Sequence, residues 1–376
     1  MKIAVNTRLL LKNKMEGIGW FTCEALSRIT KNHPEVEFLF FFDRKYDPSF
    51  VFSNNVTPII ISPPARHPVL YYIWFHYAIP AALRKHKPDL FLSPDGYLPL
   101  RCNTPTLTVF HDLNFEHYPQ DLPFFERRYY KTFFPQYARR ATRIATVSEY
   151  SASDIVKQYG VPPEKIDVVY NGANPAFKPL DKEGQAATRA SFTHGKPYFL
   201  FVGALHPRKN LVNLFKAFEL FKKQSARPHA LALAGNQSGG PRKSGKLMSK
   251  RTPYRDEVLL LGRQPADRLV ELFASAEALT YISYFEGFGI PIVEAFRAGV
   301  PVITSNITSM PEVAGDAALK ADPFSPGAYQ QSHGTNRPDP TLRNTLIEKG
   351  KERAALFTWD KTAENLWKSI IKTIKS

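Results

Sequence analysis

Short apolar runs alternate with amphipathic segments along the whole chain, and this alternation is the first structural signal in the sequence. In the first half the apolar runs are residues 2–5, 37–42, 57–61, 89–92, 106–110, 143–147 and 166–170. In the second half they are residues 198–202, 230–234, 258–261, 279–282 and 301–303. Helical spacing separates several of them, as in residues 210–223 and 267–274. The alternation predicts an α/β fold with two doubly wound parallel sheets.

The chain has 376 residues, enough for two domains that each bury a core. The segment from Pro175 to Lys196 is polar and rich in small residues, so we expect a linker at about 176–195. The predicted domains are residues 1–175 and 196–358. The final segment, Trp359 to Ile374, has apolar side chains at helical spacing and predicts an amphipathic helix.

The segment from Tyr284 to Ile303 is typical of a loop, then a helix, then a buried strand. Pro291 suits the first helical position because its fixed φ matches the helix, and two glycines just upstream let the backbone approach a ligand. The N–H groups at the helix start favour an anion. Glu286 and Glu294 lie on either side, which predicts a phosphate-bearing ligand with flanking hydroxyls, such as a nucleotide-sugar. The alternative is an ordinary connection with a solvated Glu294, and the complete motif favours the site.

Two adjacent cations, Arg208 and Lys209, come soon after the strand at 198–202, and Asn210 is a plausible N-cap of the next helix. At the carboxyl end of a strand these cations would neutralise a diphosphate, with forked contacts from arginine and a point charge from lysine. A solvated basic turn is the commoner fate of such pairs. The position at the ligand edge of the sheet favours binding.

Two further motifs are weaker. Gly17 and Gly19 follow the first strand, but Thr22 stands where the dinucleotide fingerprint requires a third glycine, so a tight turn explains them equally well. His111 ends the strand at 106–110, at the same ligand edge. A single histidine is usually structural, so both interpretations of His111 remain open.

The charge balance is strongly basic, with Lys+Arg 50 against Asp+Glu 34 and a net charge of +16. Such an excess indicates nucleic acid, an anionic membrane or phosphorylated small molecules as partners, or a diffusely basic surface with no dedicated partner. No zinc-finger, RNA-binding or helix-turn-helix pattern supports nucleic acid. The basic segment from Ser238 to Arg255 is expected to form a mobile surface loop.

The remaining signals favour the cytoplasm. No apolar run has membrane-spanning length, and the chain enters a strand at Lys2, so we expect no signal peptide. Cys23 and Cys102 make no disulfide framework and have no metal-ligand spacing. No aspartate cluster suited to a metal–diphosphate bridge stands at a strand end, so we expect neither a metal nor a cofactor.

Aromatic and cationic residues are interleaved in residues 124–140, and residues 84–87 end a second aromatic segment with cations. Aromatic rings at helical spacing are more often core than membrane-facing, but the five cations of the longer segment are not expected to be buried. If they share a face, they would attract an anionic leaflet. We therefore hypothesise reversible, peripheral docking of the first domain on the cytoplasmic membrane face.

Taken together, the motifs resemble one known family. The residues that carry the resemblance are Gly17-Ile-Gly19, His111-Asp112-Leu, Val147-Ser148-Glu, Asn171-Gly172, Gly203 with Pro207-Arg208-Lys209-Asn210, Gly262-Arg263, Glu286-Gly-Phe-Gly-x-Pro with Glu294, and Met310-Pro311-Glu312-Val with Gly315. In order and spanning nearly the whole chain, they are similar to the retaining glycosyltransferases of family four, the Glu-x7-Glu type. The bacterial mannosyltransferase-like branch is the most similar. The resemblance implies a GT-B fold, with two Rossmann-like domains facing a cleft and the C-terminal helix (359–376) crossing back to the first domain.

The resemblance also implies roles for particular residues in the second domain. Arg208 and Lys209 would bind the donor diphosphate and stabilise the leaving group, and Glu294 would bind the ribose hydroxyls. Glu286 would hold the transferred sugar. The donor site of the second domain would further include Gly203, Gly262, Arg263 and the amides of Gly287, Phe288, Gly289 and Ile290.

In the first domain, the resemblance implies that the Gly17 and Gly19 amides meet the diphosphate and that His111 lines the sugar site. The chain departs from the family at Ala204, where some branches have a further arginine. It also departs at 322–339, which is helical in most relatives but here contains two glycines and a proline.

The resulting hypothesis is a cytoplasmic, metal-independent, retaining hexosyltransferase that moves mannose or a similar hexose from a nucleotide-diphospho-sugar to a glycan or lipid-linked acceptor hydroxyl. Cell-surface polysaccharide or lipopolysaccharide synthesis is the expected setting, and GDP-mannose is the donor that the branch suggests. One alternative is a GT-B epimerase or phosphorylase-like enzyme. The other is a basic nucleic-acid-binding protein, which only the charge supports.

Overall fold

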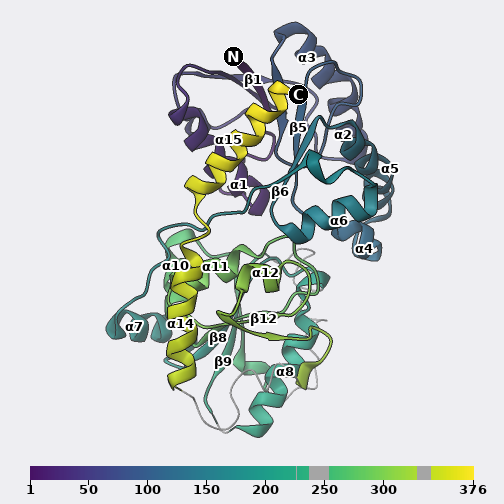
Figure 1. Ribbon diagram of the computed structural model, residues 1–376. Coiled ribbons are helices and arrows are strands. Elements are labelled where there is room, and N and C mark those ends of the chain that lie inside the picture. The colour runs from purple at the N-terminus through teal and green to yellow at the C-terminus, as the bar shows by residue number, and fades with distance from the viewer. Residues whose placement is uncertain (226, 237–253, 328–339) are drawn as a thin grey trace. The chain divides into compact units, whose positions relative to one another are not determined.

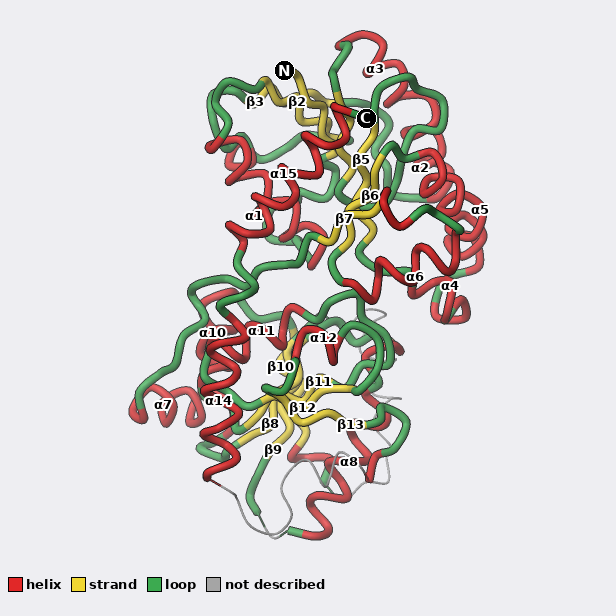
Figure 2. Tube along the Cα trace, in the orientation of Figure 1, coloured by secondary structure: helices red, strands yellow, loops and turns green. Residues whose placement is uncertain are grey.

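The computed structural model describes residues 1–225, 227–236, 254–327 and 340–376 (Figure 1). The chain forms two compact units. Unit 1 comprises Met1–Gly172 together with Trp359–Ser376, and unit 2 comprises Ala173–Thr358. Each unit contains its own parallel sheet flanked by helices (Figure 2).

Unit 1 is built on a seven-stranded sheet in the order β3-β2-β1-β4-β5-β6-β7, with every neighbouring pair parallel. All carboxyl ends therefore lie at one edge. The strands are nearly continuous apolar runs because helices cover both faces of the sheet. The strands are β1 (Lys2–Asn6), β2 (Glu37–Phe42), β3 (Val56–Ile60), β4 (Leu90–Ser93), β5 (Thr106–Phe110), β6 (Arg143–Thr146) and β7 (Ile166–Val168).

The helices of unit 1 include the C-terminal helix of the chain. α15 packs against α1 and also contacts β4, β5 and β6. The His33 and Trp367 rings stack with their centroids 3.6 Å apart, which confirms that the C-terminal helix returns to the first domain. The helices are α1 (Gly17–Asn32), α2 (Pro68–Ile73), α3 (Ile79–His86), α4 (Asn114–His117), α5 (Phe124–Arg140), α6 (Glu149–Tyr159) and α15 (Trp359–Lys375), with short turns η1 (Pro48–Phe50), η2 (Trp74–Ala78), η3 (Pro119–Asp121) and η4 (Pro163–Lys165).

Unit 2 repeats this architecture on a six-stranded parallel sheet in the order β10-β9-β8-β11-β12-β13. Its strands are β8 (Tyr198–Val202), β9 (Ala230–Ala234), β10 (Val258–Gly262), β11 (Ala278–Tyr281), β12 (Val302–Ser305) and β13 (Ala318–Ala321). Its helices are α7 (Lys182–Thr193), α8 (Leu211–Gln224), α10 (Ala266–Ala274), α11 (Ile290–Arg297), α12 (Met310–Ala314) and α14 (Pro340–Ala354), with turns η5 (Pro207–Lys209) and η6 (Arg255–Glu257). The two sheets confirm the doubly wound α/β prediction.

Each predicted strand is present with ends within two residues of the expected position. β13 was not predicted, because its four residues include a lysine and form no long apolar run. The expected linker at 175–196 is not an irregular connection. It contains α7, whose N-cap Asp181 accepts a hydrogen bond from the Gly184 N–H at 2.8 Å. Arg189 of α7 donates to the Ser275 carbonyl and so attaches the helix to the rest of unit 2.

Two predictions concern segments that lie largely outside the described residues. They are the basic loop at 238–255 and the departure from a regular helix at 322–339, of which residues 328–339 are not described. In the part of the chain that is described, no helix is long and apolar enough to cross a membrane.

Candidate active site

The principal candidate site lies at the carboxyl edge of the unit 2 sheet, where β8 and β11 are neighbours. The turn η5, which follows β8, presents Arg208 and Lys209. The loop after β11 presents Glu286 between them: Arg208 Nη1 lies 2.7 Å from Glu286 Oε2, and Lys209 Nζ lies 2.6 Å from Oε1. Each carboxylate oxygen therefore accepts a charge-assisted hydrogen bond from a different cation.

Lys209 and Glu286 are both buried, each 6% exposed. Burial alone would raise the pKa of Glu286, but Arg208 and Lys209 outweigh it and lower the pKa to about 2. The carboxylate is therefore ionised throughout the physiological range. Two cations and one carboxylate leave a positive excess within this group, which suits an anionic ligand.

Sequence reasoning did not identify Tyr281, the last residue of β11. Its hydroxyl oxygen accepts a hydrogen bond from Lys209 Nζ at 2.6 Å, and its side chain is buried. The sequence signal that could have pointed to Tyr281 was its position near the end of a predicted strand. That strand, β11, is the neighbour of β8, which the basic pair follows. Nothing in the sequence shows that the tyrosine reaches the lysine, because the contact joins the end of β11 to the turn after β8, and these segments are 72 residues apart.

Asn210 is the N-cap residue of α8, as predicted, but its side chain makes no capping hydrogen bond. Its backbone is left-handed with φ 59°, and its Nδ2 donates to the carbonyls of Ile282 and Pro323 at 3.1 and 2.6 Å. Asn210 therefore ties the basic turn to neighbouring loops, and its Oδ1, the atom that a cap would use, instead accepts from Asn213 Nδ2 at 3.0 Å.

Gly203 directly follows β8 and lies beside Lys209. Its φ of +146° disfavours a side chain, and a Cβ there would lie 3.4 Å from Lys209 Cε. Glycine at this position leaves room for the lysine stem. The close packing extends to Gly235, where a Cβ would overlap the Gly203 carbonyl oxygen at 1.8 Å.

The start of α11 adjoins Glu286. Gly289 is the N-cap with φ +95°, Ile290 is the first helical residue and Pro291 the second, one position later than expected. Gly287 and Phe288 are buried in the preceding loop. The Ser309 hydroxyl fixes this loop by donating to the Glu286 carbonyl oxygen at 2.9 Å.

Glu294 lies half-buried on α11. Among the described residues, no hydrogen bond or ion pair reaches its carboxyl group. Burial raises the pKa of Glu294 to about 8, because desolvation disfavours the charged form. The group is therefore mainly protonated at neutral pH, which differs from an ordinary solvated helix carboxylate.

Gly262 and Arg263 lie at the end of β10, two strands from β8 in the sheet order. Gly262 has φ +68°, and its carbonyl accepts the Gly235 N–H at 2.8 Å. Arg263 is exposed. This turn therefore occupies the same sheet edge as the charged group but a more peripheral position.

The remaining predicted site residues belong to unit 1. Gly17 is exposed at the start of α1, whereas Gly19 is buried and a Cβ there would lie 3.0 Å from the Leu9 carbonyl oxygen. His111 Nε2 is 2.8 Å from the Pro94 carbonyl, and its ring meets Phe21 of α1 edge-on at 5.0 Å. The start of α1 and His111 are thus brought together.

A carbonyl can only accept, so His111 Nε2 carries the hydrogen and Nδ1 is left as an acceptor. Burial lowers the pKa of His111, which keeps the ring neutral at physiological pH. His111 is therefore suited to accept a hydroxyl hydrogen bond rather than to provide a positive charge.

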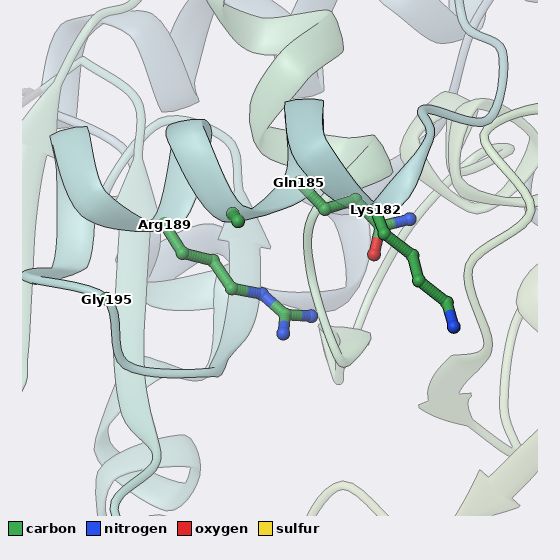
Figure 3. Close-up of a pocket in the computed structure, with 5 residues that line it drawn as sticks. Lys182, Gln185, Arg189 and Gly195 are labelled. Carbon is green, nitrogen blue, oxygen red and sulfur yellow. The ribbon is translucent and has the colours of Figure 1, made fainter.

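A pocket of about 310 Å³ in unit 2 is lined by residues of α7 and the turn after it, and it includes none of the predicted site residues (Figure 3). Two of its polar side chains anchor backbone: Gln185 donates to the Leu180 carbonyl and Arg189 to the Ser275 carbonyl, each at 3.0 Å. We do not treat it as a functional site. Across the described ranges, no three His, Cys, Asp or Glu residues are grouped so that they could hold a metal ion.

Comparison with known proteins identifies the chain's relatives. Residues 15–177 match the family model of Glycosyltransferase Family 4, and residues 185–353 match that of Glycosyl transferases group 1. The O-antigen chain mannosyltransferase B of Escherichia coli is 30% identical over 280 residues, covering 74% of this chain and 73% of that protein. The O-antigen chain mannosyltransferase RfbU of Salmonella typhimurium is 29% identical over 266 residues, 70% of each chain.

Solved structures show the same fold at lower identity. Sucrose-phosphate synthase from Thermosynechococcus elongatus matches with a TM-score of 0.78 at 20% identity, covering 99% of this chain and 98% of that one. WaaG, a glycosyltransferase involved in lipopolysaccharide biosynthesis, matches with a TM-score of 0.74 at 18% identity, covering 98% and 99%. The chain therefore belongs to glycosyltransferase family four and has the GT-B fold.

Proposed function

We propose that this glycosyltransferase is a retaining, metal-independent hexosyltransferase. It would transfer mannose or a similar hexose from a nucleotide-diphospho-sugar to a hydroxyl of a glycan or lipid-linked acceptor during cell-surface polysaccharide synthesis. The observation that carries the proposal is the charged group of Arg208, Lys209 and Glu286 beside the start of α11. Its positive excess is suited to a leaving nucleoside diphosphate.

In the reaction, the bond between the anomeric carbon and the phosphate oxygen breaks, and its electron pair leaves with the nucleoside diphosphate. The acceptor oxygen bonds to the same face of the anomeric carbon, so the α configuration is kept. The acceptor proton passes to the departing phosphate oxygen. Arg208 and Lys209 would stabilise the charge that grows on the diphosphate, and the His111 Nδ1 would accept a hydrogen bond from a sugar hydroxyl.

The donor proposal rests on the relatives. Similarity to two O-antigen mannosyltransferases supports mannose as the sugar that this chain transfers, and therefore GDP-mannose as its donor. A solved relative, HepE of Anabaena, is in complex with UDP-glucose, at 16% identity and a TM-score of 0.76 with 99% of this chain and all of that one covered. UDP-glucose is therefore the competing donor.

A nucleotide-sugar panel tests the proposal. A bound donor stabilises the folded state by mass action, so the true donor should raise Tm most, followed by its nucleoside diphosphate. Transfer of the stabilising sugar to a lipid-linked glycan should then be seen by mass spectrometry, and it should persist in EDTA. Activity restored only by Mg²⁺ or Mn²⁺ would contradict metal independence, and a protein stabilised by no nucleotide-sugar would contradict the function.

We also propose that unit 1 docks on the cytoplasmic membrane face through α5. Arg128, Lys131 and Arg139 are exposed, and their spacing places them on one face of the helix. Phe124 and Phe125, 57% and 69% exposed, lie at the start of the same face. The opposite face is buried in the unit 1 core.

Other observations fit this docking surface. α2 contacts α5 (Figure 1) and exposes further apolar side chains, including Val69 and Tyr72. Two of the five α5 cations have local roles: Arg140 donates to the Cys102 carbonyl, and Arg127 lies 5.6 Å from the Phe124 ring centroid. Three exposed cations with flanking rings are suited to an anionic leaflet, where a lipid-linked acceptor would be found.

A further inference from the structure

The Lys209 ammonium is held by two oxygens of different chemistry. Glu286 Oε1 and the Tyr281 hydroxyl oxygen each lie 2.6 Å from Lys209 Nζ. The carboxylate holds the ammonium and also cancels its charge. The hydroxyl holds it without cancelling charge, because burial raises the pKa of Tyr281 well above its ordinary value and keeps the phenol neutral.

Tyr281 is itself fixed by the sheet. Its backbone carbonyl accepts a hydrogen bond from the Thr304 hydroxyl of β12 at 2.8 Å, and its ring stacks on Phe201 of β8 with centroids 6.4 Å apart. On another side the ring packs against Gly289, where an added Cβ atom would lie 3.4 Å from Tyr281 Cε1. The hydroxyl therefore has one position, determined by three neighbouring elements.

Lysine needs such a fixed partner more than arginine does. Its four-carbon stem has many rotamers, whereas the planar guanidinium of arginine is pre-organised. An incoming diphosphate would compete with Glu286 for both cations, because it carries the same kind of charge. Tyr281 does not enter that competition and keeps its hold on Lys209 while the carboxylate interaction changes.

We propose that Tyr281 is a positioning residue that holds Lys209 for the donor diphosphate before and during transfer. The inference rests on the proposed function. It predicts that the Tyr281 hydroxyl contributes to the leaving-group step, because a pre-positioned charge lowers the barrier more than one that must be reoriented.

Tyr281→Phe tests this directly, since it removes one oxygen and keeps the buried ring. The matched control is Tyr198→Phe, which removes another buried hydroxyl from the same sheet. Tyr198 lies in β8 and donates to the Leu272 carbonyl at 2.7 Å, with no link to the cations. Melting temperature, GDP and UDP affinity by calorimetry, kcat, and KM for the donor and for the acceptor would be measured for both variants.

Tyr281→Phe should lower kcat about tenfold and weaken nucleoside diphosphate binding several-fold, with KM for the acceptor unchanged. Tyr198→Phe should lower only the melting temperature. In a Lys209→Met background, Tyr281→Phe should cause no further loss of nucleoside diphosphate affinity, because the partner is gone.

Two outcomes would contradict the inference alone: equal kcat in Tyr281→Phe and Tyr198→Phe, or an additive affinity loss in the Lys209→Met background. If Tyr281→Phe does not fold, the remaining variant is Tyr281→Leu, which fits the buried space without overpacking it, also lacks the hydroxyl oxygen and must show at least the same affinity loss. A wild-type protein that binds neither GDP nor UDP and transfers no sugar would instead contradict the proposed function, and the inference with it.

Discussion

Each unit carries a buried ionic group at the carboxyl edge of its sheet, and the two groups differ in charge balance. In unit 1, Arg8 Nε lies 2.6 Å from Asp95 Oδ2, and the two side chains are 8% and 3% exposed. Asn6 Nδ2 completes the group at 2.8 Å from Asp95 Oδ1. In unit 2, two cations share the single carboxylate of Glu286. One group is balanced, and the other has a positive excess.

The surroundings reinforce this difference. The Arg8 guanidinium lies 4.6 Å from the Tyr97 ring centroid and 5.1 Å from that of Tyr71, so aromatic faces enclose it. Arg208 remains partly accessible. Location at the ligand edge of a sheet therefore does not by itself make a binding site: a balanced, enclosed pair stabilises the fold, and an unbalanced, accessible one can bind an anion.

The largest expected effect is on the balanced group. Asp95→Ala would leave the Arg8 charge buried without its partner, and we expect a loss of about 3–5 kcal/mol in the free energy of unfolding, measured by chemical denaturation. The control is Asp360→Ala, which removes the exposed partner of Arg28 and should cost at most about 1 kcal/mol. Equal small losses in both variants would show that the unit 1 pair has no special structural role.

Lys209→Ala addresses the unbalanced group. It should lower kcat about 10²–10³-fold and change stability less than Asp95→Ala does, because the charge it removes serves the leaving group. The control is Lys222→Ala, which removes another buried lysine of unit 2, paired with Glu257 at 2.5 Å. That variant should lose stability and keep its turnover; near-normal turnover in Lys209→Ala would exclude the diphosphate role.

Glu294→Gln extends the comparison of ionic groups to a carboxyl group that has no cationic partner among the described residues. Glutamine keeps an oxygen that can accept from the ribose but removes the charge, so donor binding should weaken by about 1–2 kcal/mol, the difference between a charge-assisted and a neutral hydrogen bond. Calorimetry at a fixed pH above 8, where the carboxyl of Glu294 is ionised, measures this. Unchanged donor affinity would leave Glu294 with no part in ribose recognition.

The same substitution should change the pH dependence of stability. In the native state the pKa of Glu294 is about 8, compared with 4.5 ordinarily. Between these values the native protein binds more protons than the unfolded chain, so the wild-type free energy of unfolding should fall as pH rises. Relative to the wild type, Glu294→Gln should gain stability from pH 5 to pH 8. Parallel melting curves across this range would show that the carboxyl is solvated.

The smallest effect concerns the cations on the surface of unit 1. Arg128→Gln combined with Arg139→Gln should weaken binding to anionic liposomes by about 1 kcal/mol per charge at low salt. Lys349→Gln with Lys351→Gln removes the same charge from α14 of unit 2 and should change nothing. Flotation at low and high salt measures both, and equal, negligible binding by the wild type with and without anionic lipid would leave a merely basic surface.

The elements of the fold were predictable because parallel strands buried on both faces must be apolar along their whole length. The run Glu37–Phe42 is an example, with five of its six positions buried. The exceptions, β13 and α7, have no such pattern. α7 is a polar helix whose attachment depends on Arg189 reaching the Ser275 carbonyl, a contact that no local pattern specifies.

The candidate site was predictable only in part. The sequence singled out Arg208, Lys209 and Glu286 as candidates from their residue types and from their positions after predicted strands. It gave no sign of Tyr281 or of the partners of the Asn210 side chain, because both residues make contacts with distant segments. A motif shows which residue types a local segment contains. Hydrogen bonds between segments that are distant in the sequence depend instead on which strands are neighbours in the sheet.

By itself, the sequence determined the α/β class, the family and the residue types that meet at the sheet edge, because burial periodicity and motif chemistry are local properties. Only the tertiary structure decided that β8 and β11 lie side by side and that one carboxylate is therefore shared by two cations. It also decided that burial raises the pKa of Glu294 while Arg208 and Lys209 lower that of Glu286. The physical reason is that a pKa depends on the charges and desolvation that the fold places around a group, and not on the residue type alone.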